Sequence, residues 1–223
     1  MIQLKPYEQS FLVMARNLTK KFDYIILCEG KRDAEIIKIL NNKLALQLGD
    51  NIAITHAEGI RNLLDLAKYI GVLARLSRKL KLLGILLDLD TKKPDERFHS
   101  IKDSLNAAGL HLENIEIPSP QVYNGLLKIN RRSLDIKIAL AGSMNLPFKR
   151  HMIEDHVVEA ALLNGYISQS ILNRFNDAKI LLSTLSEDIE KILNNAEENA
   201  LKETFKPLII MLEKIKHITV TRQ

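Results

Sequence analysis

The chain has 223 residues, of which 46% are hydrophobic and 26% are charged, a balance typical of a globular protein with a packed core. Nine glycines and six prolines are too few for a low-complexity chain, and the single cysteine, Cys28, excludes an intrachain disulfide and a cysteine-based zinc site. The net charge of +5 suits a polyanionic partner and, equally, a solvated basic surface.

No segment is apolar enough to cross a membrane. The longest apolar runs, such as residues 82–87, are far shorter than the roughly 20 residues that a membrane-spanning helix needs. The short apolar run at 11–15 lacks a preceding basic region and a small-residue cleavage site, so it does not predict a signal peptide. We therefore expect a cytoplasmic protein that does not contact a membrane.

The first half of the chain alternates short apolar runs, typical of strands buried on both faces, with longer segments in which apolar residues recur at helical spacing. The strands are predicted at 24–28, 51–55, 82–87 and 114–117, and the helices at 33–48, 60–76 and 95–108. This order predicts an α/β fold in which helices flank a Rossmann-type parallel sheet.

The second half begins with two segments compatible with strands, 126–129 and 135–140, and then becomes helical. Helices are predicted at 153–163, 168–175, 181–193 and 200–215, with Pro207 as a kink or break in the last. We therefore expect an α/β domain over residues 1–150 and a helical C-terminal subdomain over residues 151–223.

Acidic residues follow two of the predicted strands. Glu29 follows the first strand, and Asp88 and Asp90 follow the third, the most hydrophobic in the chain. Ligands of open parallel sheets bind beyond the carboxyl ends of the strands, and residues two apart in an extended chain project to the same side. Three converging carboxylates would raise their own pKa values unless a cation neutralised them. Hard oxygen ligands favour Mg²⁺ or Mn²⁺.

Two stretches carry a resemblance to the Toprim domain, which topoisomerases, bacterial-type primases, recombination-mediator proteins and several nucleases share. They are Ile-Ile-Leu-Cys-Glu-Gly-Lys-Arg-Asp-Ala at 25–34 and Gly-Ile-Leu-Leu-Asp-Leu-Asp at 84–90. In that family a hydrophobic strand ends in Glu-Gly, and a later one, about 60 residues further on, ends in Asp-x-Asp, as here. The resemblance covers roughly residues 22–120 and implies a Toprim-like sheet.

The resemblance implies a catalytic centre. Glu29 would be the metal-linked general acid or base, and Asp88 and Asp90 would bind Mg²⁺. Glu29 could instead cap the strand end or form a salt bridge. Two acids at the end of a buried strand are unfavourable near a core unless they have a function, so the metal role is favoured for Asp88 and Asp90.

Further residues extend the implied site. Gly30 would let the backbone approach a phosphate, with Lys31 and Arg32 adding positive charge. Glu154 and Asp155 resemble, more loosely, the late acidic motif with which nucleases of the overcoming-lysogenization-defect type complete a second metal site. Acids that open a helix also satisfy its dipole without a metal, and we favour that structural role for Asp33 and Asp95.

The chain has no room for the tyrosine domain of a topoisomerase or the zinc domain of a primase, so it more closely resembles small Toprim nucleases. We expect a Mg²⁺- or Mn²⁺-dependent phosphodiester hydrolase that acts on DNA or RNA. The alternative is a non-catalytic, Toprim-like nucleic-acid-binding or assembly protein, whose C-terminal helices contact a second copy or a protein partner. Apolar residues at helical spacing in 180–193 and 208–215 are compatible with that contact and with packing on the sheet.

Overall fold

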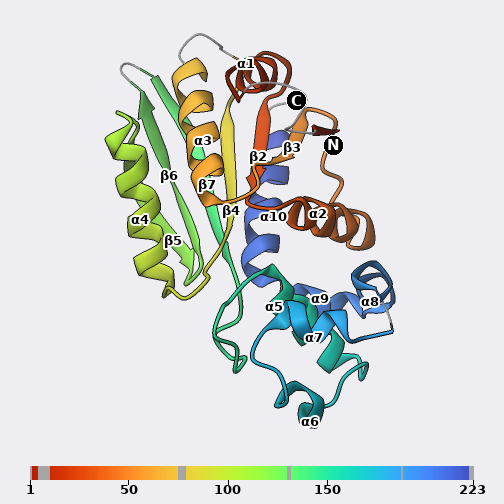
Figure 1. Ribbon diagram of the computed structural model, residues 1–223. Coiled ribbons are helices and arrows are strands. Elements are labelled where there is room, and N and C mark those ends of the chain that lie inside the picture. Colours follow the sequence, from red (N-terminus) through yellow and green to blue (C-terminus); the bar gives the residue numbers. More distant parts are fainter. Residues whose placement is uncertain (1, 5–10, 75–78, 130–131, 187, 221–223) are drawn as a thin grey trace.

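The computed structural model describes residues 2–4, 11–74, 79–129, 132–186 and 188–220 (Figure 1). Its centre is a seven-stranded sheet with the order β1-β3-β2-β4-β7-β6-β5. The strands are β1 (Ile2–Leu4), β2 (Tyr24–Cys28), β3 (Ile52–His56), β4 (Leu82–Asp88), β5 (His111–Ser119), β6 (Val122–Ile129) and β7 (Arg132–Ala141). The helices are α1 (Phe11–Lys21), α2 (Lys31–Lys43), α3 (Ile60–Ala74), α4 (Pro94–Ala107), α5 (Ile153–Leu163), α6 (Gln169–Leu172), α7 (Ala178–Ser183), α8 (Ile189–Asn195), α9 (Glu198–Thr204) and α10 (Lys206–Val220).

The sheet is mixed but mostly parallel, which confirms the predicted α/β class. Strands β1, β3, β2, β4 and β7 all run in the same direction. Strand β7 also pairs with β6 on its other side, and β7, β6 and β5 form an antiparallel meander at this edge of the sheet. The predicted strand at 114–117 is longer in the structure, and it pairs with β6 rather than with a parallel neighbour. A tight connection at residues 120–121 returns the chain directly into β6, so β5 becomes an edge strand.

Apolar cores lie on both faces of the sheet, as the unbroken apolar runs of β2 and β4 predict. Along β2, Ile25 and Leu27 pack into the core beneath α1, α3 and α4. Ile26 and Cys28 point to the opposite face and pack into the core beneath α2 and the C-terminal helices. Figure 1 shows the two helical layers on either side of the strands.

The C-terminal region is helical as predicted, with one segment divided differently and one predicted break confirmed. The segment predicted as one helix at 181–193 is two helices, α7 and α8, each with an aspartate N-cap: Asp177 accepts the Ile180 backbone N–H and Asp188 that of Lys191. The expected break at Pro207 is present, because α9 ends before it and α10 begins with the proline in its first turn.

Helix α10 returns to the sheet and packs on β7, β6 and β4. Its residues Leu208, Met211, Leu212 and Ile215 are buried there, in the same apolar core as residues from before position 150. The apolar stripe at 208–215 therefore packs on the sheet, and a division into two domains at residue 150 stays a prediction. Among the helices of the described residues, none is both long and apolar enough to span a membrane.

Candidate functional site

Four carboxylates gather at the carboxyl end of the parallel strands: Glu29, Asp33, Asp88 and Glu154. We call them the carboxylate cluster. Glu29 follows β2 and Asp88 ends β4, which is the parallel neighbour of β2, while Asp33 and Glu154 lie in the first turns of α2 and α5. The sheet thus brings Glu29 and Asp88 together, and Glu154, far along the chain, joins them. Asp33 is the member to which the sequence assigned only the structural role of an acid that satisfies a helix dipole.

Asp88 is a buried member of the cluster that is surrounded by the other acids. Its Oδ1 accepts a hydrogen bond of 2.9 Å from the Ile153 backbone N–H at the start of α5. Burial raises the pKa of Asp88 well above its usual range, and the nearby carboxylates of Asp33, Glu154 and Glu29 raise it further. The ionised form of Asp88 is therefore costly unless positive charge is added beside it.

Asp33 shares this environment. Its Oδ2 accepts a hydrogen bond of 2.9 Å from the Gly30 backbone N–H, which closes the first turn of α2. Burial, opposed by that hydrogen bond and reinforced by the charges of Glu154 and Glu29, raises the pKa of Asp33 to about 7. The sequence signal for this placement is that Asp33 follows Glu29 by four residues. An aspartate that only stabilises the start of a helix gives the same pattern, so the signal does not distinguish the two roles.

Asp90 lies beside the cluster, and its carboxylate is paired with two arginines. The strand ends at Asp88, and Asp90 takes a left-handed conformation with φ of 54°, so the extended alternation expected for the pair does not reach it. Its backbone pairs with that of His151 in an isolated antiparallel bridge. Its carboxylate accepts hydrogen bonds from Arg97 at 2.9 Å and Arg150 at 2.8 Å. Its role as a metal ligand stays a prediction.

Arg97 is a buried guanidinium that the sequence did not single out. From α4 it donates through Nε to the Asp88 carbonyl oxygen at 2.7 Å and through Nη2 to Asp90. The same Nη2 lies 3.6 Å from Glu29 Oε2. Burial raises the pKa of Glu29, and the charge of Arg97 opposes that rise. Arg97 therefore partly neutralises this edge of the cluster.

Glu154 is almost fully buried among charges. Its Oε1 accepts a hydrogen bond of 3.2 Å from Arg32 and lies 3.6 Å from Lys179 Nζ. Its Oε2 is buried and accepts no hydrogen bond from the described residues. The structure therefore places Glu154 at the carboxylate cluster, and its role as a metal ligand stays a prediction.

Asp155, its neighbour in sequence, lies in a different environment. Its Oδ2 accepts hydrogen bonds of 3.0 Å from the Ser143 backbone N–H and from His151 Nδ1. Burial raises the pKa of Asp155, while those two hydrogen bonds and the charges of His151 and His156 lower it. Asp155 thus holds the loop after β7 against α5, and the structure does not bring it together with Glu154 and the other cluster carboxylates.

The three residues predicted to bind phosphate all have partners within the protein. Gly30 donates its backbone N–H to Asp33, and Lys31 forms an exposed ion pair with Glu35 at 3.4 Å. Arg32 is bound to the carboxylate cluster. Positive charge is therefore present where the sequence predicted it, but part of it neutralises the protein's own acids.

Two observations bear on whether the cluster fits a divalent cation. Glu29 Oε2 and Glu154 Oε2 are both buried and accept no hydrogen bond within the described part of the chain, and buried polar atoms of this kind call for a partner. The carboxylates do not converge into a preformed cage, since no three Asp, Glu, His or Cys side chains of the described residues are placed to hold a metal ion. The donor set fits Mg²⁺, which is usually bound through one or two carboxylates plus waters and substrate phosphates.

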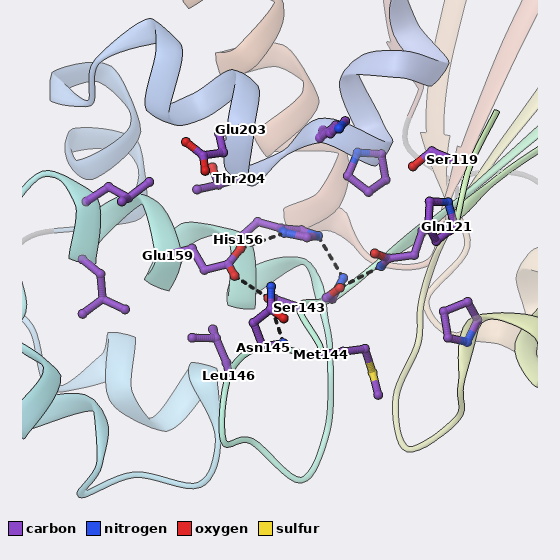
Figure 2. Close-up of a pocket in the computed structure, with 17 residues that line it drawn as sticks. Ser119, Gln121, Ser143, Met144, Asn145, Leu146, His156, Glu159, Glu203 and Thr204 are labelled. Atoms are coloured by element: carbon purple, nitrogen blue, oxygen red, sulfur yellow. Dashed lines mark hydrogen bonds and ion pairs between the residues drawn. The ribbon is translucent and has the colours of Figure 1, made fainter.

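A separate cavity of about 600 Å³ lies on another side of α5 (Figure 2). His156 Nε2 accepts the Gly142 backbone N–H at 2.9 Å, Ser143 Oγ hydrogen-bonds Glu159, and Gln121 donates to the Gly142 carbonyl oxygen at 2.7 Å. None of the residues predicted as metal ligands lines this cavity. Its polar groups mainly join the loop after β7 to α5 and to the β5–β6 turn.

The fold and site define an α/β protein with a mostly parallel sheet and a carboxylate cluster at the carboxyl ends of its strands. More particularly, a family model described as "Protein of unknown function (DUF3226)" matches residues 23–210, and the chain belongs to this family. Searches of curated proteins and of solved structures gave no match.

Proposed function

We propose that this protein is a Toprim-like, Mg²⁺- or Mn²⁺-dependent phosphodiester hydrolase, a nuclease that acts on DNA or RNA. One observation carries the proposal: carboxylates from the ends of two adjacent parallel strands and from the start of α5 share one edge of the sheet, and two of their oxygens are buried without a hydrogen bond. Carboxylate clusters of this kind repel themselves unless a cation neutralises them.

Within this proposal one or two of the carboxylates of Glu29, Asp88 and Glu154 would hold the cation, together with waters and substrate phosphate oxygens. A bound divalent cation supplies a more acidic water and stabilises charge on the phosphoryl oxygens. The Ile153 backbone N–H holds Asp88 in place. Glu29, whose pKa burial raises, is suited to move a proton at its carboxylate as general acid or base. Arg97 limits the repulsion between Glu29 and its acidic neighbours.

The alternative, a Toprim-like protein that binds nucleic acid or assembles without cleaving it, is favoured by one specific observation. Arg97 and Arg150 occupy both carboxylate oxygens of Asp90, which the family resemblance makes a metal ligand. A protein whose second aspartate stays paired with arginines would bind a polyanion and leave it intact. Contact with a second copy or a protein partner through the C-terminal helices belongs to this alternative.

The test is a cleavage assay with the full chain on labelled single- and double-stranded DNA and RNA, with Mg²⁺, Mn²⁺ or EDTA. We expect metal-dependent cleavage that Asp88→Asn lowers by more than about 100-fold, because losing even groups that only support metal ligands costs about 10- to 100-fold. The matched control is Asp103→Asn, an exposed carboxylate of α4, which should cleave like the wild type. Binding without cleavage, or full activity in Asp88→Asn, would favour the alternative.

A further inference from the structure

A groove of about 360 Å³ lies between α3 and α4, and four basic side chains line it: Arg61, Lys68, Lys92 and Arg97. We call it the cationic groove. Arg61 and Lys68 come from the first turn and the middle of α3, Lys92 from the loop after β4, and Arg97 from the first turns of α4. The lining includes one acidic residue, Asp65.

The groove carries positive charge that the protein does not neutralise. Asp65 is engaged by Lys68, with 3.1 Å between its Oδ1 and the Lys68 Nζ. Within the described residues, neither Arg61 nor Lys92 has a carboxylate within ion-pair distance. Like charges gathered in a concave surface raise the local potential and attract anions.

Arg97 connects this groove with the carboxylate cluster. It lines the groove, and it also donates to the Asp88 carbonyl oxygen and to the Asp90 carboxylate, with Glu29 3.6 Å away. Its side chain is almost fully buried, so its position is fixed by these contacts. A guanidinium has five N–H donors in a planar fork that matches the geometry of a phosphate. An anion in the groove would therefore lie directly beside the carboxylate cluster.

We propose that the cationic groove binds the backbone phosphates of a nucleic-acid strand next to the phosphodiester that lies at the carboxylate cluster. The inference rests on the proposed function and gives that site its substrate-binding surface, on residues different from Gly30, Lys31 and Arg32. The contacts are to phosphate, so they position the strand without reading its sequence. DNA and RNA share this chemistry, and the experiment distinguishes them.

The experiment measures fluorescence anisotropy of a labelled single strand of about 12 nucleotides, a length within the span of a single-strand site, as DNA and as RNA, in EDTA over a range of salt concentrations. We expect Arg61→Ala/Lys92→Ala to weaken binding by about 10-fold or more and to lower the slope of log K against log salt by about 1 to 2. The matched control is Lys102→Ala/Lys202→Ala, which also removes two positive charges. Lys102 lies on the opposite side of α4 from the groove-lining Ser100 and Ser104, and Lys202 lies on α9.

A third variant separates this inference from hydrolysis. Asp88→Asn should bind either strand at least as tightly as the wild type, because Asp88 does not line the groove and the substitution adds no negative charge. Suppose that the protein cleaves no substrate but Arg61→Ala/Lys92→Ala still lowers the affinity and the slope of log K against log salt. The proposed hydrolase activity is then contradicted, and the proposal that the groove binds a strand is supported. Equal binding by the groove and control variants, or no binding of either strand by the wild type at low salt, overturns the groove whatever the cleavage assay shows.

Discussion

Glu154 and Asp155 are adjacent in sequence and share the first turn of α5, yet they lie in two different regions of the molecule. Each of the two acids has one buried oxygen without a hydrogen bond among the described residues, but their surroundings differ. Glu154 faces the carboxylate cluster, where it meets Arg32, Lys179 and other acids. Asp155 faces the loop after β7, where Ser143 and His151 both donate to it. The comparison teaches that the direction in which a helix turns an acid, rather than its place in a motif, decides which charged and polar groups surround it.

The same contrast extends to the surroundings of the two acids. Beside Asp155, the cavity of Figure 2 is lined by groups that hydrogen-bond one another, such as His156 with the Gly142 backbone and Ser143 with Glu159. Such contacts contribute to stability. At the carboxylate cluster the acids raise one another's pKa values. Ionising these acids is therefore costly for the protein alone, and we expect a cation to offset that cost.

The largest expected effect is on metal affinity. Glu154→Gln should weaken Mn²⁺ binding by about 10- to 100-fold, the loss typical of groups that support a metal site. Asp155→Asn should change it much less, because Asp155 lies apart from the cluster. Calorimetric titration of both variants measures the difference. Equal losses of Mn²⁺ affinity in the two variants would contradict the assignment of the two acids to different regions.

The next effect is on the free energy of unfolding. We expect substitution of Asp155 to lower it and substitution of Glu154 to leave it unchanged or raise it. Asp155→Ala removes the acceptor of two buried hydrogen bonds and should lower the free energy of unfolding by about 2 kcal/mol. Glu154→Gln should be neutral or stabilising in EDTA, since it removes a charge from a cluster of like charges. Urea unfolding in EDTA measures both, with Asp103→Ala as the exposed control. An Asp155→Ala protein as stable as the wild type would contradict this assignment.

A further effect is a pH dependence of stability that sharpens the comparison. Burial raises the pKa of Asp33 from 3.8 to about 7, so between these values the folded protein holds a proton that the unfolded chain has released. Stability in EDTA should therefore be highest near the lower value and fall as the pH rises toward 7. Asp33→Asn keeps an acceptor for the Gly30 N–H and should flatten that fall. Urea unfolding over this pH range measures it, and an identical slope in both proteins would show that Asp33 is not the responsible group.

Sequence patterns predicted the parallel core of the fold well, because β2, β3 and β4 are continuous apolar runs that must be buried on both faces. They also placed Glu29 and Asp88 at one edge, since adjacent parallel strands end together. The antiparallel pairing of β5 was not predictable in this way. An apolar run carries no information on the direction of its neighbour, and the hairpin into β6 decides it.

The parts of the site that sequence patterns missed depend on contacts between distant segments. Asp90 leaves the extended conformation because its backbone pairs with His151, some sixty residues further on. In the sequence Arg97 has the pattern of a surface residue on an amphipathic helix. In the structure it is buried against Glu29, Asp88 and Asp90, which lie at or just after the ends of β2 and β4. Neither the Asp90–His151 pairing nor the contacts of Arg97 can be predicted from the residues nearby in the sequence.

The most direct test of the central claim, that the carboxylate cluster holds a divalent cation, is a calorimetric titration of Mn²⁺ into the wild type and Asp88→Asn at about pH 6 and about pH 8. We expect binding to the wild type that is tighter at the higher pH, because the cation displaces protons from Asp33 and Asp88, and that is lost in Asp88→Asn. Binding that Asp88→Asn retains unchanged, or wild-type affinity that does not depend on pH, would contradict the claim.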